Sequence, residues 1–168
     1  KAAPGYLMAK NIIRMIVNLG KLINNDPDVA GRMKVVYLED YNVTLAEKLM
    51  PAADFSEQIS LAGTEASGTG NMKLMINGAV TLGTMDGANV EIYEQVGKDN
   101  MFLFGMNVDE VRDLWSRGYN PQDFLNANAQ LQDVVNMLTS GVLGKRFDDI
   151  AASLLTYRFG TPDQYMTL

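Results

Sequence analysis

The strongest constraint on the fold is an alternation of short β-prone runs with helical segments between residues 34 and 105. Strand-like runs cover residues 34–40, 58–60, 79–84 and 101–105, and helical patterns cover residues 44–49, 71–77 and 90–96. The first run includes Val35-Val36-Tyr37-Leu38, which predicts a strand buried on both faces. Because such alternation with short connections is typical of parallel sheets, we predict an α/β fold with a doubly wound, Rossmann-like parallel sheet.

The ends of the chain have a helical character. Apolar residues at helical spacing predict a long helix over residues 6–24, and Thr44 and Glu47 have the spacing of a capping box for the 44–49 helix. After Gly105, helical patterns at 108–117, 121–126, 131–138 and 147–156 replace the alternation. We therefore expect residues 1–106 to form an α/β core and residues 107–168 a helical C-terminal appendage.

A glycine-rich loop between the second strand and its following helix is the first candidate site. The loop runs from Glu65 to Lys73, and its small residues allow backbone N–H groups to approach an anion at a helix N-terminus. Lys73, about one turn into the helix, can hold a phosphorylated ligand as an ammonium or as a Schiff base, which suggests pyridoxal phosphate. A helix-capping loop with a surface lysine explains the same residues.

Three loops are expected at the carboxyl edge of the predicted sheet, where ligands of doubly wound folds bind. They cover residues 39–44, 61–73 and 84–89. Glu65 is a candidate acceptor for sugar hydroxyls or a solvated loop residue, and Asp86 is better explained as an Asx turn or helix N-cap. Gly68-Thr69-Gly70 lacks the third glycine of a dinucleotide fingerprint, and the Walker pattern is also missing.

Composition excludes several kinds of chemistry. The 168 residues include no cysteine and no histidine, which removes disulfides, thiol nucleophiles, histidine-based zinc sites and Ser-His-Asp catalysis. The net charge of −6, with scattered lysines and arginines, argues against nucleic acid as a partner. No apolar run has the length of a membrane span, so we expect a soluble protein without a membrane partner. We also expect a cytoplasmic location and no metal site.

Several longer motifs resemble those of one family, the α-glucan (glycogen, starch and maltodextrin) phosphorylases. They are Lys1-Ala2-Ala3-Pro4-Gly5-Tyr6, Pro51-Ala52-Ala53-Asp54, Ser56-Glu57-Gln58-Ile59-Ser60, the loop from Glu65 to Lys73, and Gly83-Thr84-Met85-Asp86-Gly87-Ala88-Asn89-Val90-Glu91. The resemblance extends in order to about Gly118 and more weakly to the end. It implies the C-terminal half of a GT-B type glycosyltransferase fold, with the active site in a cleft between two domains.

The resemblance also implies a cofactor site. The lysine at the position of Lys73 forms a Schiff base with pyridoxal phosphate, and the residues matching Gly68, Thr69 and Gly70 hold the cofactor phosphate. Tyr41 matches a residue that lines the cofactor pocket. At the next position, this sequence has Asn42 where some members have arginine, so a cofactor contact there is not carried over.

For the substrate, the resemblance implies that Glu65, Ala66, Ser67 and Gly68 contact the glucosyl unit and that Tyr6 lies at the mouth of the cleft. The implied reaction is reversible phosphorolysis of an α-1,4-glucan by inorganic phosphate to glucose 1-phosphate, with retention. The cofactor phosphate takes part in proton transfer, for which a second pKa of ~6 is suitable. Lys73 is then the anchor and not the acid or base.

The matched region also suggests a piece of a longer protein. Members of the family have further phosphate-binding lysines and arginines upstream of Lys1 and terminal helices beyond Leu168, and residues 141–147 look shortened. We expect a homodimeric parent and an isolated chain that is inactive, has an empty cofactor site and self-associates through an exposed apolar face. The alternatives are a non-catalytic sugar- or phosphate-binding module and a nucleotide-sugar glycosyltransferase domain.

Overall fold

The structure is a computed structural model that describes residues 2–29, 31–156 and 165–168. It divides into two compact units. The sheet unit comprises residues 42–119 and 164–168, and the helical unit comprises residues 1–41 and 120–163. The division of the chain into a core of residues 1–106 and an appendage of residues 107–168 stays a prediction.

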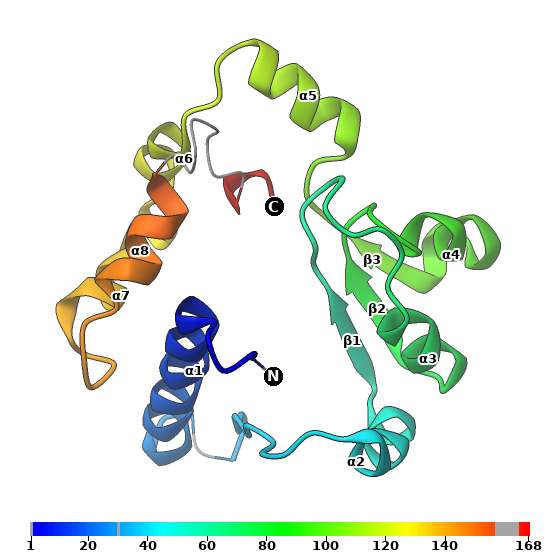
Figure 1. The fold of residues 1–168 in the computed structure, drawn as a ribbon, viewed down its shortest axis with the longest axis horizontal. Helices are drawn as coiled ribbons and strands as arrows, with labels where there is room; N and C mark the ends of the chain where they lie inside the picture. The colour runs from blue at the N-terminus through cyan, green and yellow to red at the C-terminus, as the bar shows by residue number, and fades with distance from the viewer. Residues whose placement is uncertain (1, 30, 157–164) are drawn as a thin grey trace. The chain divides into compact units, whose positions relative to one another are not determined.

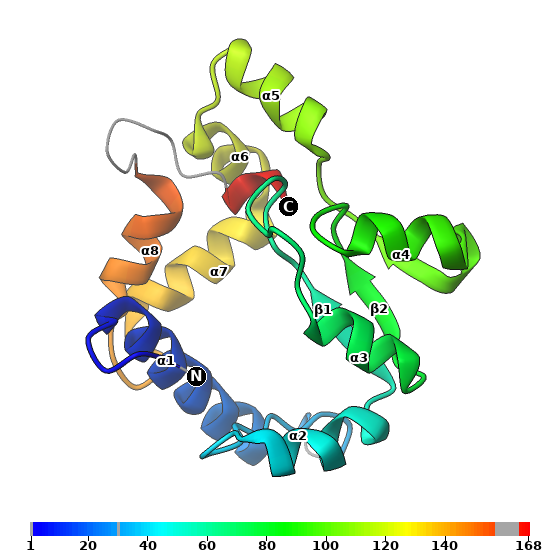
Figure 2. The ribbon, with the colours of Figure 1, turned by 45° about the vertical axis from the view of Figure 1, so that its right-hand side comes forward.

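The described part of the sheet unit is built on three parallel strands in the order β1-β2-β3. They are β1 (Phe55–Gln58), β2 (Val80–Gly83) and β3 (Met101–Leu103). The helices α3 (Gly70–Ile76) and α4 (Asn89–Val96) connect them in turn. Both connections step in the same direction, and parallel crossovers are right-handed, so both helices lie on one face of the sheet, as Figures 1 and 2 show.

The two faces of this sheet differ in burial. Ser56, Thr81 and Met101 stand side by side in the register and are at most 6% exposed. Phe55 and Phe102 point to the other face and are 65% and 59% exposed. A doubly wound sheet has helices on both faces, so the described residues show the coarser class only, a mixed α/β fold with a small parallel sheet.

Short elements complete the sheet unit. They are α2 (Val43–Leu49), the 3-10 turns η1 (Met50–Ala52), η2 (Lys98–Asn100) and η3 (Tyr165–Thr167), and α5 (Val108–Ser116). At the start of α5, the Asn107 side chain accepts hydrogen bonds from the Asp109 and Glu110 N–H groups, and the Glu110 carboxylate accepts one from the Asn107 N–H. This reciprocal cap explains where α5 begins.

The helical unit consists of helices around an apolar core. Its helices are α1 (Leu7–Asn25), α6 (Pro121–Ala127), α7 (Ala129–Ser140) and α8 (Asp148–Leu155). Phe147 is fully buried at the start of α8, and its N–H donates to the Leu138 carbonyl at 2.7 Å. Met8, Met15 and Leu19, at helical spacing on α1, pack against this core. In the part of the chain that the structure describes, no helix combines the length and apolar character that crossing a bilayer requires.

One surface ion pair of the helical unit affects the acidity of its partners. The guanidinium of Arg146 donates to the Asp148 carboxylate at 2.9 Å and 2.5 Å. This hydrogen bonding lowers the pKa of Asp148 below its ordinary value and raises the pKa of Arg146. Both groups are exposed, so the pair adds little to stability.

The predicted helices are confirmed with small shifts at their ends, but the predicted strand at residues 34–40 is wrong. Residues 33–38 have no regular secondary structure, and Val36 is 61% exposed. The Asn24 side chain donates to the Val35 carbonyl and accepts from the Val35 N–H, both at 2.8 Å. The Val35 side chain also lies against Gly20 of α1. Val35 therefore pairs with the end of α1 in place of a strand.

The predicted capping box at Thr44 is also wrong. α2 begins one residue earlier, and its N-cap is Asn42, whose side chain accepts a hydrogen bond from the Leu45 N–H at 3.0 Å. Asn and Thr both cap helices well. Asn42 is in the extended conformation that an N-cap requires, which places Thr44 inside the first turn of the helix.

Candidate functional site

The glycine-rich loop leads from β1 into α3 with little side-chain support of its own. Gly68 has a φ of +81°, a conformation that favours glycine, and Thr69 precedes α3 without a side-chain capping bond. A Cβ on Gly70 would meet nothing within 4 Å. Among the described residues, the N–H groups of Gly70 and Asn71 have no acceptor. The start of α3 therefore has open space and available donors.

Lys73 lies in this short helix as its only charged residue. Its backbone is held, because its N–H donates to the Thr69 carbonyl and its carbonyl accepts from the Asn77 side chain at 2.8 Å. Its side chain is exposed, and no salt bridge involves it among the described residues. The amine is thus free to react or to bind an anion while its backbone stays in place.

The turn after β2, at residues 84–88, holds the chain that leads into the loop. One oxygen of the Asp86 carboxylate accepts a hydrogen bond from the Gly63 N–H and the other accepts one from the Glu65 N–H, each at 2.9 Å. Asp86 is only 6% exposed, and its two partners lie 23 and 21 residues upstream. The interpretation of Asp86 as an Asx turn or N-cap is therefore wrong, since Ala88 precedes α4 and Asp86 is a long-range support.

Further contacts from the same turn reach the loop. The Thr84 hydroxyl donates to the Ser60 carbonyl and the Ala88 N–H donates to the Ser67 carbonyl, both at 2.6 Å. Gly87 has a φ of +55°, and a Cβ there would lie 2.6 Å from the Ser67 carbonyl oxygen. The turn therefore contacts the chain between Ser60 and Ser67, which leads into and begins the loop, and leaves no room at Gly87 for a side chain.

A second support holds α3. The Asn89 amide nitrogen donates to the carbonyls of Thr84 at 2.9 Å and Gln58 at 3.3 Å, and its oxygen accepts from the Asn71 amide at 2.9 Å. Asn89 and Asn71 are 1% and 3% exposed. Sequence analysis assigned neither residue a role, although Asn71 is the first residue of a predicted helix, Asn89 directly precedes another, and both stand in motifs that resemble the phosphorylases.

The segment from Glu65 to Gly68, which is predicted to contact the sugar, is held through its backbone and has exposed side chains at Glu65, Ala66 and Ser67. The Glu65 carboxylate accepts a long hydrogen bond of 3.4 Å from the Ser67 N–H, which leaves most of its acceptor capacity unused. The structure thus brings Glu65, Ser67 and the turn at Asp86 together.

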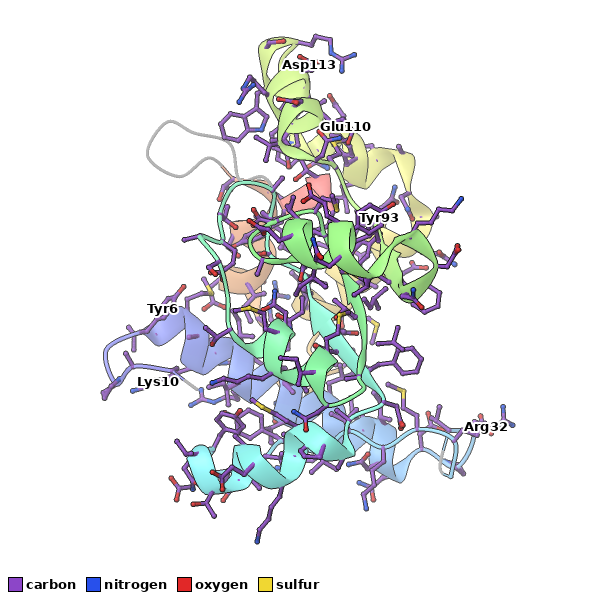
Figure 3. The ribbon with its side chains drawn as sticks, turned by 90° about the vertical axis from the view of Figure 1, so that its right-hand side faces the viewer. Tyr6, Lys10, Arg32, Tyr93, Glu110 and Asp113 are labelled. Carbon is purple, nitrogen blue, oxygen red and sulfur yellow. The ribbon has the colours of Figure 1, made fainter. Side chains whose placement is uncertain are left out.

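The two predicted tyrosines belong to the helical unit. Tyr6 is 55% exposed next to the start of α1 (Figure 3), and Tyr41 is 39% exposed. Their roles at the mouth of the cleft and in the cofactor pocket stay predictions. Asn42, for which no cofactor contact was carried over, caps α2.

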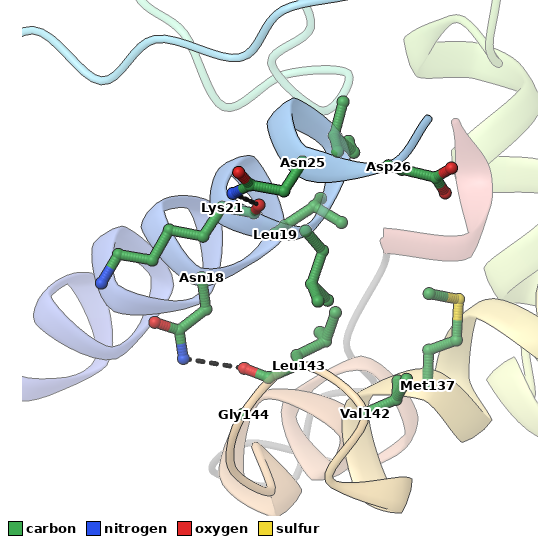
Figure 4. Close-up of a pocket in the computed structure, with 11 residues that line it drawn as sticks. Asn18, Leu19, Lys21, Asn25, Asp26, Met137, Val142, Leu143 and Gly144 are labelled. Carbon is green, nitrogen blue, oxygen red and sulfur yellow. Dashed lines mark hydrogen bonds between the residues drawn. The ribbon is translucent and has the colours of Figure 1, made fainter. Parts of the chain in front are cut away.

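The helical unit has an open groove of its own. It has a volume of about 870 Å³ and lies between α1 and the segment that joins α7 to α8 (Figure 4). Leu19, Leu22, Met137 and Leu143 give it a mainly apolar lining, and the Asn18 amide donates to the Leu143 carbonyl across it. None of the predicted site residues lines this groove.

The sheet unit contains a lysine-bearing helix that directly follows a supported glycine loop. Comparison with known proteins identifies the family. The carbohydrate phosphorylase family matches residues 1–168, and the chain belongs to this family. It is 55% identical to the muscle form of glycogen phosphorylase from Rattus norvegicus and from Homo sapiens over 150 residues, which are 89% of this chain and 18% of each relative. It is 52% identical to the brain form from Ovis aries over 161 residues, 94% of this chain and 19% of the relative. The chain thus spans about a fifth of the length of these relatives.

Proposed function

We propose that this chain is the cofactor-carrying part of an α-1,4-glucan phosphorylase, which transfers a glucosyl unit from a glucan to inorganic phosphate with retention and forms glucose 1-phosphate. The observation that carries the proposal is the exposed Lys73, which has no ion-pair partner among the described residues and whose backbone is held directly after the glycine loop. The names of its relatives, glycogen phosphorylases, support the reaction class.

The residues present fit a pyridoxal phosphate cofactor. Lys73 would bind its aldehyde covalently, and Gly68, Thr69 and Gly70 would hold its phosphate, next to the available N–H groups of Gly70 and Asn71. When bound, the cofactor supplies a phosphate group that can exchange protons near neutral pH. Lys73 would anchor the cofactor, and the glycines of the loop would leave space for its phosphate because they have no side chains.

The segment from Glu65 to Gly68 is proposed to bind the glucosyl unit. The side chains of Glu65 and Ser67 are exposed and have acceptors and donors for sugar hydroxyls. Since the backbone of this segment is held by the turn at Asp86, these groups can be oriented before the sugar arrives.

We also propose that the sheet unit belongs to the C-terminal half of a GT-B fold. The exposed sheet face at Phe55 and Phe102 supports this proposal, since parallel sheets are normally covered on both faces. A doubly wound sheet, a cytoplasmic homodimeric parent and the role of Tyr41 are parts of the same proposal.

The cofactor is tested in a full-length chain that carries this segment. After pyridoxal phosphate is added and borohydride reduces the product, peptide mapping should find the cofactor on Lys73, and a Lys73→Ala variant should lose both the adduct and phosphorolysis. Lys98→Ala, which removes another exposed lysine of the sheet unit, is the matched control. An unmodified Lys73 would favour a sugar-binding module or a nucleotide-sugar glycosyltransferase over our proposal.

The isolated 168-residue chain is expected to be inactive. It spans about a fifth of its relatives, so most groups that position substrate and stabilise charge in them are outside it. Release of glucose 1-phosphate from maltodextrin and phosphate by the isolated chain would contradict this expectation, and light scattering would test its self-association.

A further inference from the structure

We propose that Asp86 is a positioning residue for the sugar-binding segment and acts separately from the support that holds the cofactor-bearing helix. This inference rests on the proposed function. Asp86 itself is buried and contacts the segment only through backbone N–H groups, so it acts through Glu65 and its neighbours and not on the substrate.

The first step of the argument is the geometry of the carboxylate. Its two oxygens accept from the Gly63 and Glu65 N–H groups at equal distances of 2.9 Å, so both sides of the group are engaged. Hydrogen bonds to a charged acceptor are stronger than those between neutral groups. Together they set where the chain enters the segment and which way the Glu65 side chain can point.

The second step is the separation of two supports that start from one turn. The contacts of Asp86 end at Glu65, whereas those of Asn89 reach Asn71 inside α3, on the other side of Gly68 and Thr69. Gly68 and Gly70 lie between them, and their conformational freedom allows the backbone there to absorb a displacement. A change at Asp86 should therefore move the sugar segment and leave the helix of Lys73 in place.

An asparagine at position 86 keeps the size of the side chain but removes its charge and one of its two acceptor oxygens. Asp86→Asn keeps one acceptor oxygen, but its NH₂ group must face a backbone N–H that is also a donor. One of the two hydrogen bonds is lost and the segment from Gly63 to Glu65 has to shift. Because small displacements of substrate-positioning groups can reduce rates about 100-fold, we expect kcat/KM for the glucan to fall about 10- to 100-fold.

The experiment compares variants in a full-length chain that carries this segment, with kcat, KM for the glucan and borohydride trapping of pyridoxal phosphate at Lys73 as readouts. Asp86→Asn should lose kcat/KM while trapping stays at the wild-type level. Asp113→Asn, the same chemical change at an exposed position of α5 (Figure 3), is the matched control and should leave both unchanged. Gly87→Ala presses on the Ser67 carbonyl and the Glu65 side chain without changing charge, and should reproduce the effect of Asp86→Asn.

The outcomes separate this inference from the proposed function. If the wild-type chain neither traps the cofactor nor forms glucose 1-phosphate, the proposed function fails, and the positioning role fails with it. If the wild type does both but Asp86→Asn behaves like Asp113→Asn, only the positioning role is wrong. If Asp86→Asn and Gly87→Ala both lose the cofactor or do not fold, the turn supports the whole unit, and the separate role of Asp86 is again wrong.

Discussion

The interiors of the two units are stabilised by different kinds of contact. The helical unit has an apolar core, with Leu125, Leu138, Phe147 and Ile150 at most 9% exposed. The buried polar residues among those described, namely Ser56, Asn71, Thr81, Thr84, Asp86, Asn89 and Thr167, all belong to the sheet unit. Apolar burial is non-directional, whereas hydrogen bonds specify where a loop runs. The unit with the candidate site thus relies on directional contacts where its loop must have one path.

The largest effect is expected from the apolar core of the helical unit. Phe147→Ala should lower the free energy of unfolding of the 168-residue chain by about 3–5 kcal/mol, because it removes a fully buried aromatic ring and leaves a cavity. Denaturant unfolding followed by circular dichroism measures this change. Phe102→Ala removes the same ring where it is 59% exposed and should cost less than about 1 kcal/mol. Equal effects would show that the contrast in burial has no energetic counterpart.

The polar interior of the sheet unit should respond to a change of charge at constant size. Asn89→Asp replaces the NH₂ donor between the Thr84 and Gln58 carbonyls with a carboxylate, and should destabilise by about 3 kcal/mol at neutral pH. The new carboxyl should have a raised pKa, since burial and the carbonyls disfavour its charged form. The deficit should therefore shrink as pH falls through that pKa, because the protonated group can again donate.

Asn100→Asp is the control for this change. The Asn100 amide also donates to a carbonyl, that of Val96, but it is exposed, so water can solvate the new carboxylate. We expect a loss of less than about 1 kcal/mol with little pH dependence. A loss as large as that of Asn89→Asp would mean that the position of the amide in the interior does not matter.

Gly83 and Gly70 of the sheet unit differ in the space around them, one being tightly packed and the other open. A Cβ on Gly83 would lie 2.6 Å from the Gln58 carbonyl oxygen, so Gly83→Ala should destabilise by about 1–3 kcal/mol. Gly70→Ala meets open space at the first position of α3 and should be neutral or stabilise by up to about 1 kcal/mol. Thermal unfolding of both variants measures these changes in stability. A destabilised Gly70→Ala variant would contradict the open space around Gly70.

Sequence analysis predicted what local patterns determine. Helical spacing located α1 and α5 to α8, and the β-prone runs at 79–84 and 101–105 contain β2 and β3. The run at 58–60 was placed too late in the chain, since β1 covers Phe55–Gln58 and shares only Gln58 with it. The run at 34–40 did not become a strand, because the Asn24 side chain occupies the Val35 N–H and carbonyl groups that a sheet ladder would use. No pattern within residues 34–40 reveals that competitor, which lies on a helix 11 residues upstream.

At the site, sequence analysis located the loop and its lysine but not the residues that hold them. Glycine and lysine spacing identifies residues 65–73 because the features lie side by side in the chain. Asp86 and Asn89 act across 18 to 31 residues, and their burial depends on how β1 and β2 pair. An aspartate in a glycine-rich turn is locally most compatible with an Asx turn, and only the fold shows its distant partners.

The smallest effects should arise where the two units use the same device. Asn42 caps α2 in the sheet unit and Asn128 caps α7 in the helical unit, each through a 3.0 Å hydrogen bond from the N–H three residues on. Asn42→Ala and Asn128→Ala should therefore each cost about 1 kcal/mol, measured by denaturant unfolding. Thr44→Ala should cost less, because Thr44 lies inside the first turn and is not the cap. Unequal losses at Asn42 and Asn128 would extend the contrast between the units from their interiors to their helix ends, whereas equal losses confine it to what each unit buries.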